Sequence, residues 1–159
     1  MKVRVGFGFD VHQLREGRPC ILGGVEITHH KGPLGHSDAD VLIHAICDAL
    51  LGAAGLRDIG FHFPDTSAEF KNADSKLLLA RVMELIRDKG FEPGNIDATL
   101  VAEQPKINPH VTAMKEVLSK VTGMDTDDIS IKATTNEKMG YIGREEGITA
   151  YAVVLLYKN

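Results

Sequence analysis

Residues 37–55 read SDADVLIHAICDALLGAAG, and this stretch decides the fold because it predicts a helix buried on all sides. From Val41 to Ala54, only His44, Asp48 and Gly52 interrupt the apolar pattern. Asp40, His44 and Asp48 are four residues apart, so they form one polar row along the helix. Because a buried polar group needs a partner, His44 should meet either Asp48 within the core or a ligand, a metal or a substrate.

The beginning of this helix carries a second signal. Ser37 is a good N-cap residue, and Asp40 completes a capping box of the carboxylate type. His36 precedes it. Free N–H groups and the helix dipole make a helix N-terminus favourable for anions. The pair therefore indicates either an anion site or a simple cap beside a solvated histidine.

The composition of the 159 residues is that of one globular domain, which we expect to span residues 1–159. Hydrophobic residues make up 43% and charged residues 25%, both ordinary values. A net charge of -4 and the absence of tryptophan argue against a nucleic-acid partner. The apolar runs are too short to cross a bilayer, so no membrane partner is expected.

The cysteines and the first residues predict a cytoplasmic protein. Cys20 and Cys47 are too few for a disulfide framework and lack the CxxC spacing of a zinc site. We interpret both as reduced packing residues. The chain opens with MKVRVGFGFDVH, which alternates like a strand and contains no signal-peptide hydrophobic region.

That first strand alternates apolar residues with Arg4, Gly6 and Gly8, and the glycines permit another element to approach its backbone closely. We expect it to end in Asp10-Val11-His12. Residues i and i+2 of a strand point to the same side, so Asp10 and His12 should project together.

The remaining segments predict an α/β sandwich, a sheet with helices packed on one face. Residues 18–28 read as a hairpin around a glycine pair, and residues 56–74 as a long loop of the kind that is often functional. Helices are expected at residues 75–89 and 111–122, and strands at residues 95–103, 129–134 and 148–157. The last strand is apolar throughout, as for burial on both faces, and an oligomer would cover the open face.

Three of these residues suggest metal chemistry. Asp10, His12 and His44 supply two imidazoles and a carboxylate, which with an open fourth position is the pattern of a catalytic zinc site. Asp48 lies one turn beyond His44 and is expected to accept the other ring N–H of that ligand.

A polar loop follows the strand at residues 129–134. Thr134, Thr135 and Asn136 offer polar groups for phosphate, and Glu137 suits a hard cation such as Mg²⁺, although a plain polar turn explains the same residues. Lys106 and Arg144 are the best-placed loop cations.

Four motifs together resemble the 2-C-methyl-D-erythritol 2,4-cyclodiphosphate synthase family across essentially the whole chain. The motifs are GFDVH at residues 8–12, GHSDADVLIHAICDALLGAAGLRDIGFHFPDT at 35–66, AEQPKINPH at 102–110 and KATTNEKMGYIGREEGI at 132–148. The resemblance implies a metal-dependent phosphorus-oxygen lyase of the non-mevalonate isoprenoid pathway. It implies that 4-diphosphocytidyl-2-C-methyl-D-erythritol 2-phosphate is cyclised with release of CMP. It also implies a homotrimer with active sites between subunits.

The resemblance also assigns roles to residues. Asp10, His12 and His44 would bind Zn²⁺ or another divalent metal, and Glu137 would hold Mg²⁺ or Mn²⁺ bridging the diphosphate. His36 and Thr135 would stabilise the transition state as catalytic residues. Substrate contacts near the metal and the sugar alcohol would come from Asp10, His12, His36, Ser37, Asp58, Ile59, Gly60, Phe63, Pro64, Asp65, Thr66 and Ser67. Contacts to the nucleotide and phosphates would come from Ala102, Pro105, Lys106, Ile107, Asn108, Thr134, Thr135, Asn136 and Glu137.

Tyr141 and Arg144 would lie near the trimer axis, where the resemblance suggests a cavity for an isoprenoid diphosphate. Two positions depart from the family pattern, His62 in the DIGFHFPDT loop and Asn136 in the last motif. Two other classes of protein explain part of the pattern. One is a trimeric regulator that binds an anion at its interfaces, and the other is a zinc-dependent phosphohydrolase.

Overall fold

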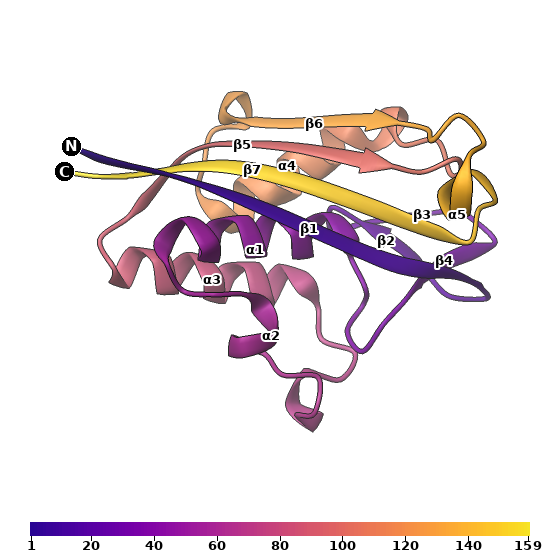
Figure 1. The fold of residues 1–159 in the computed structure, drawn as a ribbon, viewed down its shortest axis with the longest axis horizontal. Helices are drawn as coiled ribbons and strands as arrows, with labels where there is room; N and C mark the ends of the chain where they lie inside the picture. The colour runs from indigo at the N-terminus through magenta and orange to yellow at the C-terminus, as the bar shows by residue number, and fades with distance from the viewer.

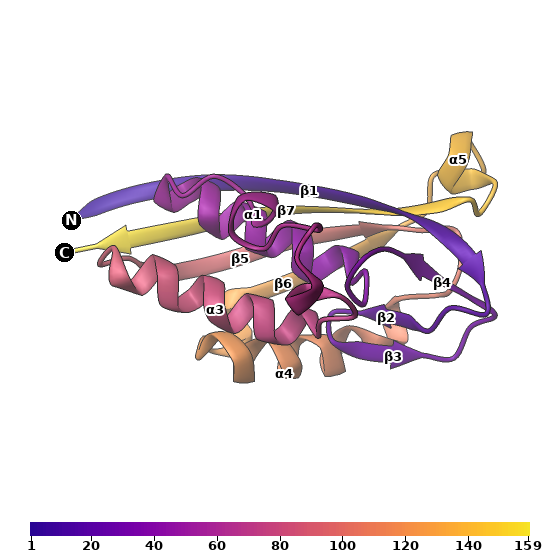
Figure 2. The same ribbon diagram turned by 90° about the horizontal axis from the view of Figure 1, so that it is seen from below.

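A five-stranded sheet carries three long helices on one face, with strand order β4-β1-β7-β5-β6 (Figures 1 and 2). The computed structural model describes residues 1–159. The strands are β1 Lys2–Glu16, β4 Lys31–Leu34, β5 Glu92–Val101, β6 Ile129–Thr134 and β7 Gly147–Lys158. All neighbouring strands are antiparallel except β5 and β6, which are parallel. The predicted sandwich with helices on one face is confirmed.

The helices on the covered face are α1 Val41–Ala54, α3 Ser75–Asp88 and α4 Val111–Thr122. Short helices α2 Ile59–His62 and α5 Gly140–Gly143 lie in segments that the sequence predicts as loops. Strands β2 Cys20–Leu22 and β3 Val25–Ile27 form the predicted hairpin as a separate two-stranded sheet. Helix α1 lies against β1 and β7, α3 packs beside α1, and α4 covers β6 at the other end of the sheet (Figures 1 and 2).

Helix α1 is the centre of the core, as the sequence predicts, and 12 of its residues are buried. It lies directly on the glycine face of β1. A Cβ atom on Gly6 would lie 1.9 Å from the carbonyl oxygen of Ala49, and one on Gly8 would lie 1.8 Å from that of Ala45. Glycine is therefore required at both positions because the backbones of strand and helix are in contact.

Replacing Gly8 with alanine should destabilise the fold by more than the roughly 1–3 kcal/mol of ordinary overpacking, because the obstructing atom belongs to the helix backbone. Urea-induced unfolding measures the change. Gly52→Ala is the matched control, because a Cβ there meets nothing within 4 Å. It should stabilise helix α1 by about 0.5–1 kcal/mol. Equal midpoints for the Gly8 variant and the unaltered chain would contradict the close approach.

The first turn of α1 corrects the prediction for its cap. Helix α1 begins at Val41, and its N-cap is Asp40, whose carboxylate accepts the N–H of Ile43 at 3.1 Å. The same carboxylate accepts the N–H of Gly23 at 2.9 Å and of Gly24 at 2.7 Å, which ties the β2–β3 hairpin to the helix. Burial raises the pKa of Asp40 to about 6, against the opposing effect of these backbone donors. Ser37 is therefore not the cap.

The open face of the sheet leaves part of β7 uncovered in one chain. Residues 147–150 are all buried, but from Ala150 onward buried residues alternate with exposed or half-buried ones, and Tyr151 and Val153 are exposed. Burial of both faces therefore stays a prediction for an oligomer. The apolar residues of β1 face the same way as Tyr151 and Val153. Exposed large side chains on β1 and β7 are Val3, Val5, Phe7, Phe9, Val11, Tyr151 and Val153. Phe9 and Tyr151 contact each other with ring centroids 5.3 Å apart.

The two cysteines and the lengths of the helices bear on the remaining predictions. Cys20 and Cys47 are both free and buried, and burial raises the pKa of the Cys20 thiol to about 11. The prediction that they are reduced packing residues is in keeping with this. None of the helices has both the length and the apolar character needed to cross a membrane.

Candidate active site

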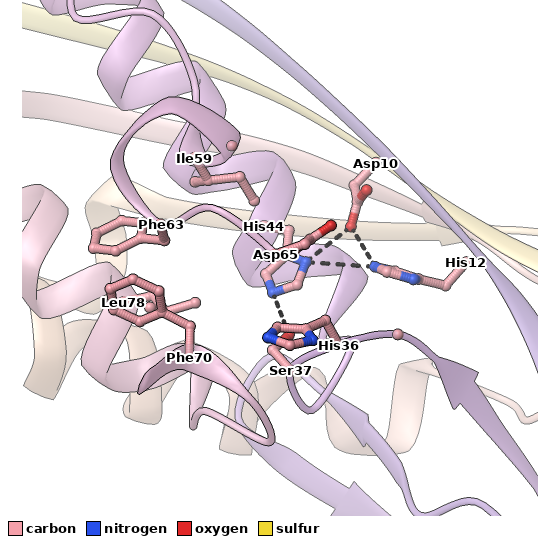
Figure 3. A pocket seen from close by; sticks show the side chains of 12 residues that line it. Asp10, His12, His36, Ser37, His44, Ile59, Phe63, Asp65, Phe70 and Leu78 are labelled. Carbon is pink, nitrogen blue, oxygen red and sulfur yellow. Dashed lines mark hydrogen bonds and ion pairs between the residues drawn. The ribbon is translucent and has the colours of Figure 1, made fainter. Parts of the chain in front are cut away.

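Three metal-ligand side chains meet between β1 and α1 (Figure 3). Asp10 Oδ2 lies 2.9 Å from His12 Nε2 and 3.1 Å from His44 Nδ1, and the two ring nitrogens are 3.4 Å apart. Strand β1 continues to Glu16 rather than ending at His12, yet the pleat still places Asp10 and His12 on one side. The predicted cluster of three ligands is therefore brought together by the fold.

Each of the two imidazoles turns one ring nitrogen toward Asp10 and the other toward a group outside the cluster. His12 Nδ1 lies 2.9 Å from the carbonyl oxygen of Leu34, which can only accept, so His12 Nδ1 carries the proton. Its Nε2 then presents a lone pair toward Asp10. His44 Nε2 faces the hydroxyl groups of Ser37 at 3.2 Å and Ser75 at 2.9 Å. Carboxylate and imidazole lone pairs that converge in this way fit a divalent cation.

The pKa values of Asp10 and His12 are shifted by their contact with each other. Burial alone would raise the pKa of Asp10, but hydrogen bonds with His12 and His44 outweigh it and hold that pKa below its usual value. For His12, burial acts to lower the pKa, and the hydrogen bond with Asp10 raises it above the usual value. The site therefore stabilises a proton or a cation between the carboxylate and the rings.

Asp48 does not have the partner predicted for it. Its carboxylate accepts the backbone N–H of Ile59 at 2.8 Å, at the beginning of α2, while the outward nitrogen of His44 contacts two serines. Burial raises the pKa of Asp48. A row of polar residues along one helix indicated a contact within that helix, but the partner of His44 comes from α3.

A pocket of about 240 Å³ opens beside the three ligands. Figure 3 shows the polar ligands on one side and the rings of Phe63 and Phe70 on the other. Its lining consists of Asp10, His12, Gly35, His36, Ser37, His44, Ile59, Gly60, Phe63, Asp65, Phe70 and Leu78. Nine of these residues are predicted site residues. The sequence did not single out Gly35, Phe70 and Leu78 for the site, because Leu78 reads as a core position and the loop has no regular period.

The predicted anion site at the beginning of α1 is not supported. The carboxylate of Asp40 already caps the first turn, so a second anion there would meet a negative charge. His36 lies at the pocket with its Nε2 3.2 Å from the carbonyl oxygen of Ser67. Ser37 accepts the N–H of Ala39 at 3.1 Å and lies 3.2 Å from His44.

A second pocket, of about 510 Å³, lies at the ends of β5 and β6. Its lining consists of Ala102, Glu103, Gln104, Pro105, Lys106, Ile107, Asn108, Pro109, Ala133, Thr134 and Thr135. Seven of the nine residues predicted to contact the nucleotide and phosphates are here, including Thr135, and the two that are not are Asn136 and Glu137. No residue lines both this pocket and the pocket beside the ligands. Within one chain, the predicted catalytic residues His36 and Thr135 therefore lie in different pockets.

The other predicted residues lie around these pockets without lining them. Asp58 caps α2 by accepting the N–H of Phe61 at 2.9 Å. Pro64, Thr66 and Ser67 belong to the loop between α2 and α3. The N–H of Glu137 donates to Thr135 Oγ1 at 3.2 Å, and Asn136 donates to the carbonyl oxygen of Met139 at 2.7 Å.

The last motif also lines a third pocket, of about 330 Å³, together with residues of β1. Tyr141 lies in its lining, and its hydroxyl group is 2.9 Å from Thr149 Oγ1. Arg144 is not in the lining and pairs with Glu146 at 2.9 Å. His62, a departure from the family pattern, lies 2.7 Å from the carbonyl oxygen of Leu56 and outside all three pockets.

Comparisons with known proteins all find similarity to one family over nearly the whole chain. Residues 3–157 match the YgbB family. The 2-C-methyl-D-erythritol 2,4-cyclodiphosphate synthase of Bacteroides fragilis is 65% identical, and the match covers 98% of each chain. A structure of the bifunctional IspDF of Campylobacter jejuni is 44% identical with a TM-score of 0.96, and the match covers 99% of this chain and 43% of that longer chain. A structure of Plasmodium falciparum IspF in complex with CDP is 36% identical with a TM-score of 0.87, and the match covers 99% and 97% of the two chains.

Proposed function

Because the chain belongs to the YgbB family, the family of 2-C-methyl-D-erythritol 2,4-cyclodiphosphate synthases, we propose that its two pockets bind different parts of the substrate of that enzyme. The enzyme converts 4-diphosphocytidyl-2-C-methyl-D-erythritol 2-phosphate to 2-C-methyl-D-erythritol 2,4-cyclodiphosphate and CMP, in non-mevalonate isoprenoid biosynthesis. The observation that carries the proposal is the convergence of Asp10, His12 and His44 on a pocket.

The reaction places few demands on proton transfer. An oxygen of the 2-phosphate forms a bond to the β-phosphorus, and the bond from that phosphorus to the bridging oxygen breaks. CMP leaves with the electron pair of that bond. The attacking phosphate oxygen is already anionic at neutral pH, so no general base is needed. What the protein must supply is alignment of the phosphates and neutralisation of their charge.

We propose that Asp10, His12 and His44 hold Zn²⁺ or another divalent metal, and that Glu137 holds Mg²⁺ or Mn²⁺ together with substrate phosphates. Such cations neutralise phosphate charge and orient the reacting groups. The donor set supports the first assignment, because two imidazole lone pairs and a carboxylate face one point. The exposed carboxylate of Glu137, on the loop after β6, is in keeping with the second.

The other residues of the first pocket bind and orient the sugar alcohol and its phosphates. His36 lies beside Ser37 at the mouth of the ligand cluster. Its Nε2 faces the carbonyl oxygen of Ser67, so the ring would donate to a phosphate oxygen after turning or after taking a second proton on Nδ1. The rings of Phe63 and Phe70 meet edge to face with centroids 5.4 Å apart and form an apolar wall of the pocket. That wall excludes water from one side of the reacting phosphates.

The second pocket is proposed to hold the cytidine part of the substrate. Residues 102–109, together with Ala133, Thr134 and Thr135, line a space of about 510 Å³, which suits a nucleoside. Lys106 brings a positive charge to the neighbouring phosphate, and the Thr135 hydroxyl donates to a phosphate oxygen. The complex of Plasmodium falciparum IspF with CDP supports a ligand of this chemistry.

A homotrimer with sites between subunits is the assembly we propose. The open face of the sheet exposes a row of large apolar side chains on β1 and β7, and such a surface favours burial against other copies. The separation of the two pockets within one chain supports sites completed by a neighbour. A heterologous contact that closes after three copies brings one pocket of each kind together three times.

Two smaller assignments belong to the same proposal. A cytoplasmic location is supported by two buried cysteines without a disulfide. The third pocket, lined by Val11 and Tyr141 among others, is the proposed position near the trimer axis for an isoprenoid diphosphate, with Arg144 close by in the sequence.

An assay with the diphosphocytidyl substrate, Mg²⁺ and Zn²⁺ tests the function against its alternatives. We expect CMP and the cyclic diphosphate in equal amounts, without inorganic phosphate. Release of inorganic phosphate would instead indicate a zinc-dependent phosphohydrolase. Binding of the substrate without turnover would indicate a regulator. Chelation of metal before the assay should abolish CMP release, and added metal should restore it.

A further inference from the structure

We propose that Ser75 and Asp38 are positioning residues, which fix the ring of His44 so that Nδ1 presents its lone pair to the metal. This inference rests on the metal site of the proposed function and adds to it two residues from outside the three ligands. They act on the metal only through His44. The observation is a chain of hydrogen bonds that runs from α1 to the beginning of α3.

The chain begins at the outward nitrogen of His44. Its Nε2 lies 2.9 Å from Ser75 Oγ, and Ser75 Oγ is hydrogen-bonded in turn to Asp38 Oδ1. Ser75 is the first residue of α3 and is completely buried, so no solvent competes for its hydroxyl group. His44 itself is 6% exposed. Polar groups enclosed in this way need fixed partners.

The direction of each hydrogen bond follows from the groups around Asp38. Both of its oxygens face obligate donors, because Oδ1 accepts the N–H of Asp40 at 3.1 Å and Oδ2 accepts the N–H of Ser75 at 2.9 Å. A carboxylate has no proton to donate, so the single hydroxyl proton of Ser75 goes to Asp38. Ser75 Oγ must then accept from His44, and that requires a proton on Nε2 of the ring.

A neutral imidazole with its proton on Nε2 has its lone pair on Nδ1. That atom lies 3.1 Å from Asp10 Oδ2 and 3.4 Å from His12 Nε2, inside the ligand cluster. The carbonyl oxygen of Leu34 has the matching effect on His12, because it accepts from the outward Nδ1 of that ring. Each ring therefore has one outside acceptor that turns its other nitrogen toward the metal.

The chain is held in place at its far end by the backbone. The N–H of Asp38 donates to the carbonyl oxygen of Ala73 at 3.1 Å, so Asp38 is fixed to the segment that enters α3. Ser37 Oγ is a second neighbour of His44 Nε2 at 3.2 Å and also accepts the N–H of Ala39. Ser75 gives the shorter contact and is the only one of the two serines bonded to a carboxylate.

Ser75→Ala tests the inference, and Asp48→Asn is the matched control because Asp48 bonds to Ile59 rather than to His44. The zinc dissociation constant of each purified protein is measured by competition with a chromophoric chelator. We expect Ser75→Ala to weaken zinc binding by roughly ten- to a hundredfold. Asp48→Asn should leave the dissociation constant within about twofold, since it lies outside the hydrogen-bond chain.

Nuclear magnetic resonance of protein with ¹⁵N-labelled histidine gives a readout that does not depend on zinc or activity. At about pH 8, metal-free unaltered protein should show His44 with its proton on Nε2, exchanging slowly with water, and the zinc-loaded form should coordinate through Nδ1. In Ser75→Ala, exchange of that proton should become faster. The His44 signal is identified by its absence from His44→Ala.

The outcomes separate this inference from the function on which it rests. If the unaltered protein binds no zinc, the proposed metal site fails, while the spectrum still reports the state of the His44 ring. If it binds zinc and Ser75→Ala binds it equally well, the positioning role is wrong. If Ser75→Ala does not fold, the unaltered protein decides alone: a proton on Nδ1, or coordination through Nε2, overturns the inference.

Discussion

Replacing His44 with alanine is expected to remove the metal and stop turnover while the fold stays assembled. Three ligands would drop to two, and a third of a metal-binding free energy of about 10–16 kcal/mol would be lost. That loss weakens binding by at least a few hundredfold. Without the metal, Asp10 and the incoming phosphates repel each other, so CMP release should fall by at least about a hundredfold.

Elemental analysis of the purified variant measures the zinc content directly, and circular dichroism verifies the fold. His30→Ala is the control, because His30 is an exposed histidine whose ring contacts Glu16 and His29 and lies outside the ligand cluster. It should keep its full zinc content and its activity. Stoichiometric zinc in the His44 variant would remove His44 from the ligand set.

The sequence alone was sufficient for the ligand cluster because two simple periodicities determine it. Asp10 and His12 share a side of β1 by the pleat, and His44 lies on a helix too apolar to be anywhere but the core. Gly6 and Gly8 then indicate which strand that helix contacts. The three side chains had to meet once α1 lay on β1.

The partner of His44 was beyond the reach of the same argument. A periodic row shows only the neighbours within one helix, and it pointed to Asp48. The actual partner, Ser75, is 31 positions away and arrives through the packing of α3 against α1. Long-range contacts also explain why Asp40, rather than Ser37, caps α1. The carboxylate of Asp40 accepts the N–H groups of the glycine turn between β2 and β3 as well.

The open face of the sheet illustrates a different limit. The apolar sequence of β7 predicts burial, and in one chain its Tyr151 and Val153 are exposed. Sequence reports that a surface avoids water but not whether the chain itself or another copy covers it. Both faces of this strand would be buried only in an assembly of several copies. Such an assembly would also bring the pockets of neighbouring subunits together.

Two inactive proteins are expected to regain activity when they are combined. His44→Ala disables the pocket beside the metal ligands, and Lys106→Glu disables the pocket at the ends of β5 and β6 by reversing a charge. Each protein alone should be nearly inactive. If a site takes one pocket from each of two neighbouring subunits, some sites in a mixed trimer contain neither substitution.

The recovered fraction follows from random assembly. When the two proteins are unfolded, mixed in equal amounts and refolded together, each half of a site is intact with a probability of about one half. About a quarter of the sites should therefore work. A mixture of His44→Ala with unaltered protein calibrates the measurement, since about half of its sites should work whether or not subunits share them.

Different affinity tags on the two proteins, purified in succession, establish that mixed oligomers have formed. CMP release by that fraction is then compared with the unaltered enzyme. Because the homotrimers have been removed and each mixed trimer has one intact site of its three, about a third of the sites in this fraction should work. Substantial recovery would mean that the pocket of His44 in one subunit works with the pocket of Lys106 in another. Mixed oligomers without activity would place both halves of the site in one chain. The two pockets of that chain would then have to be brought together by a movement of the loops that line them.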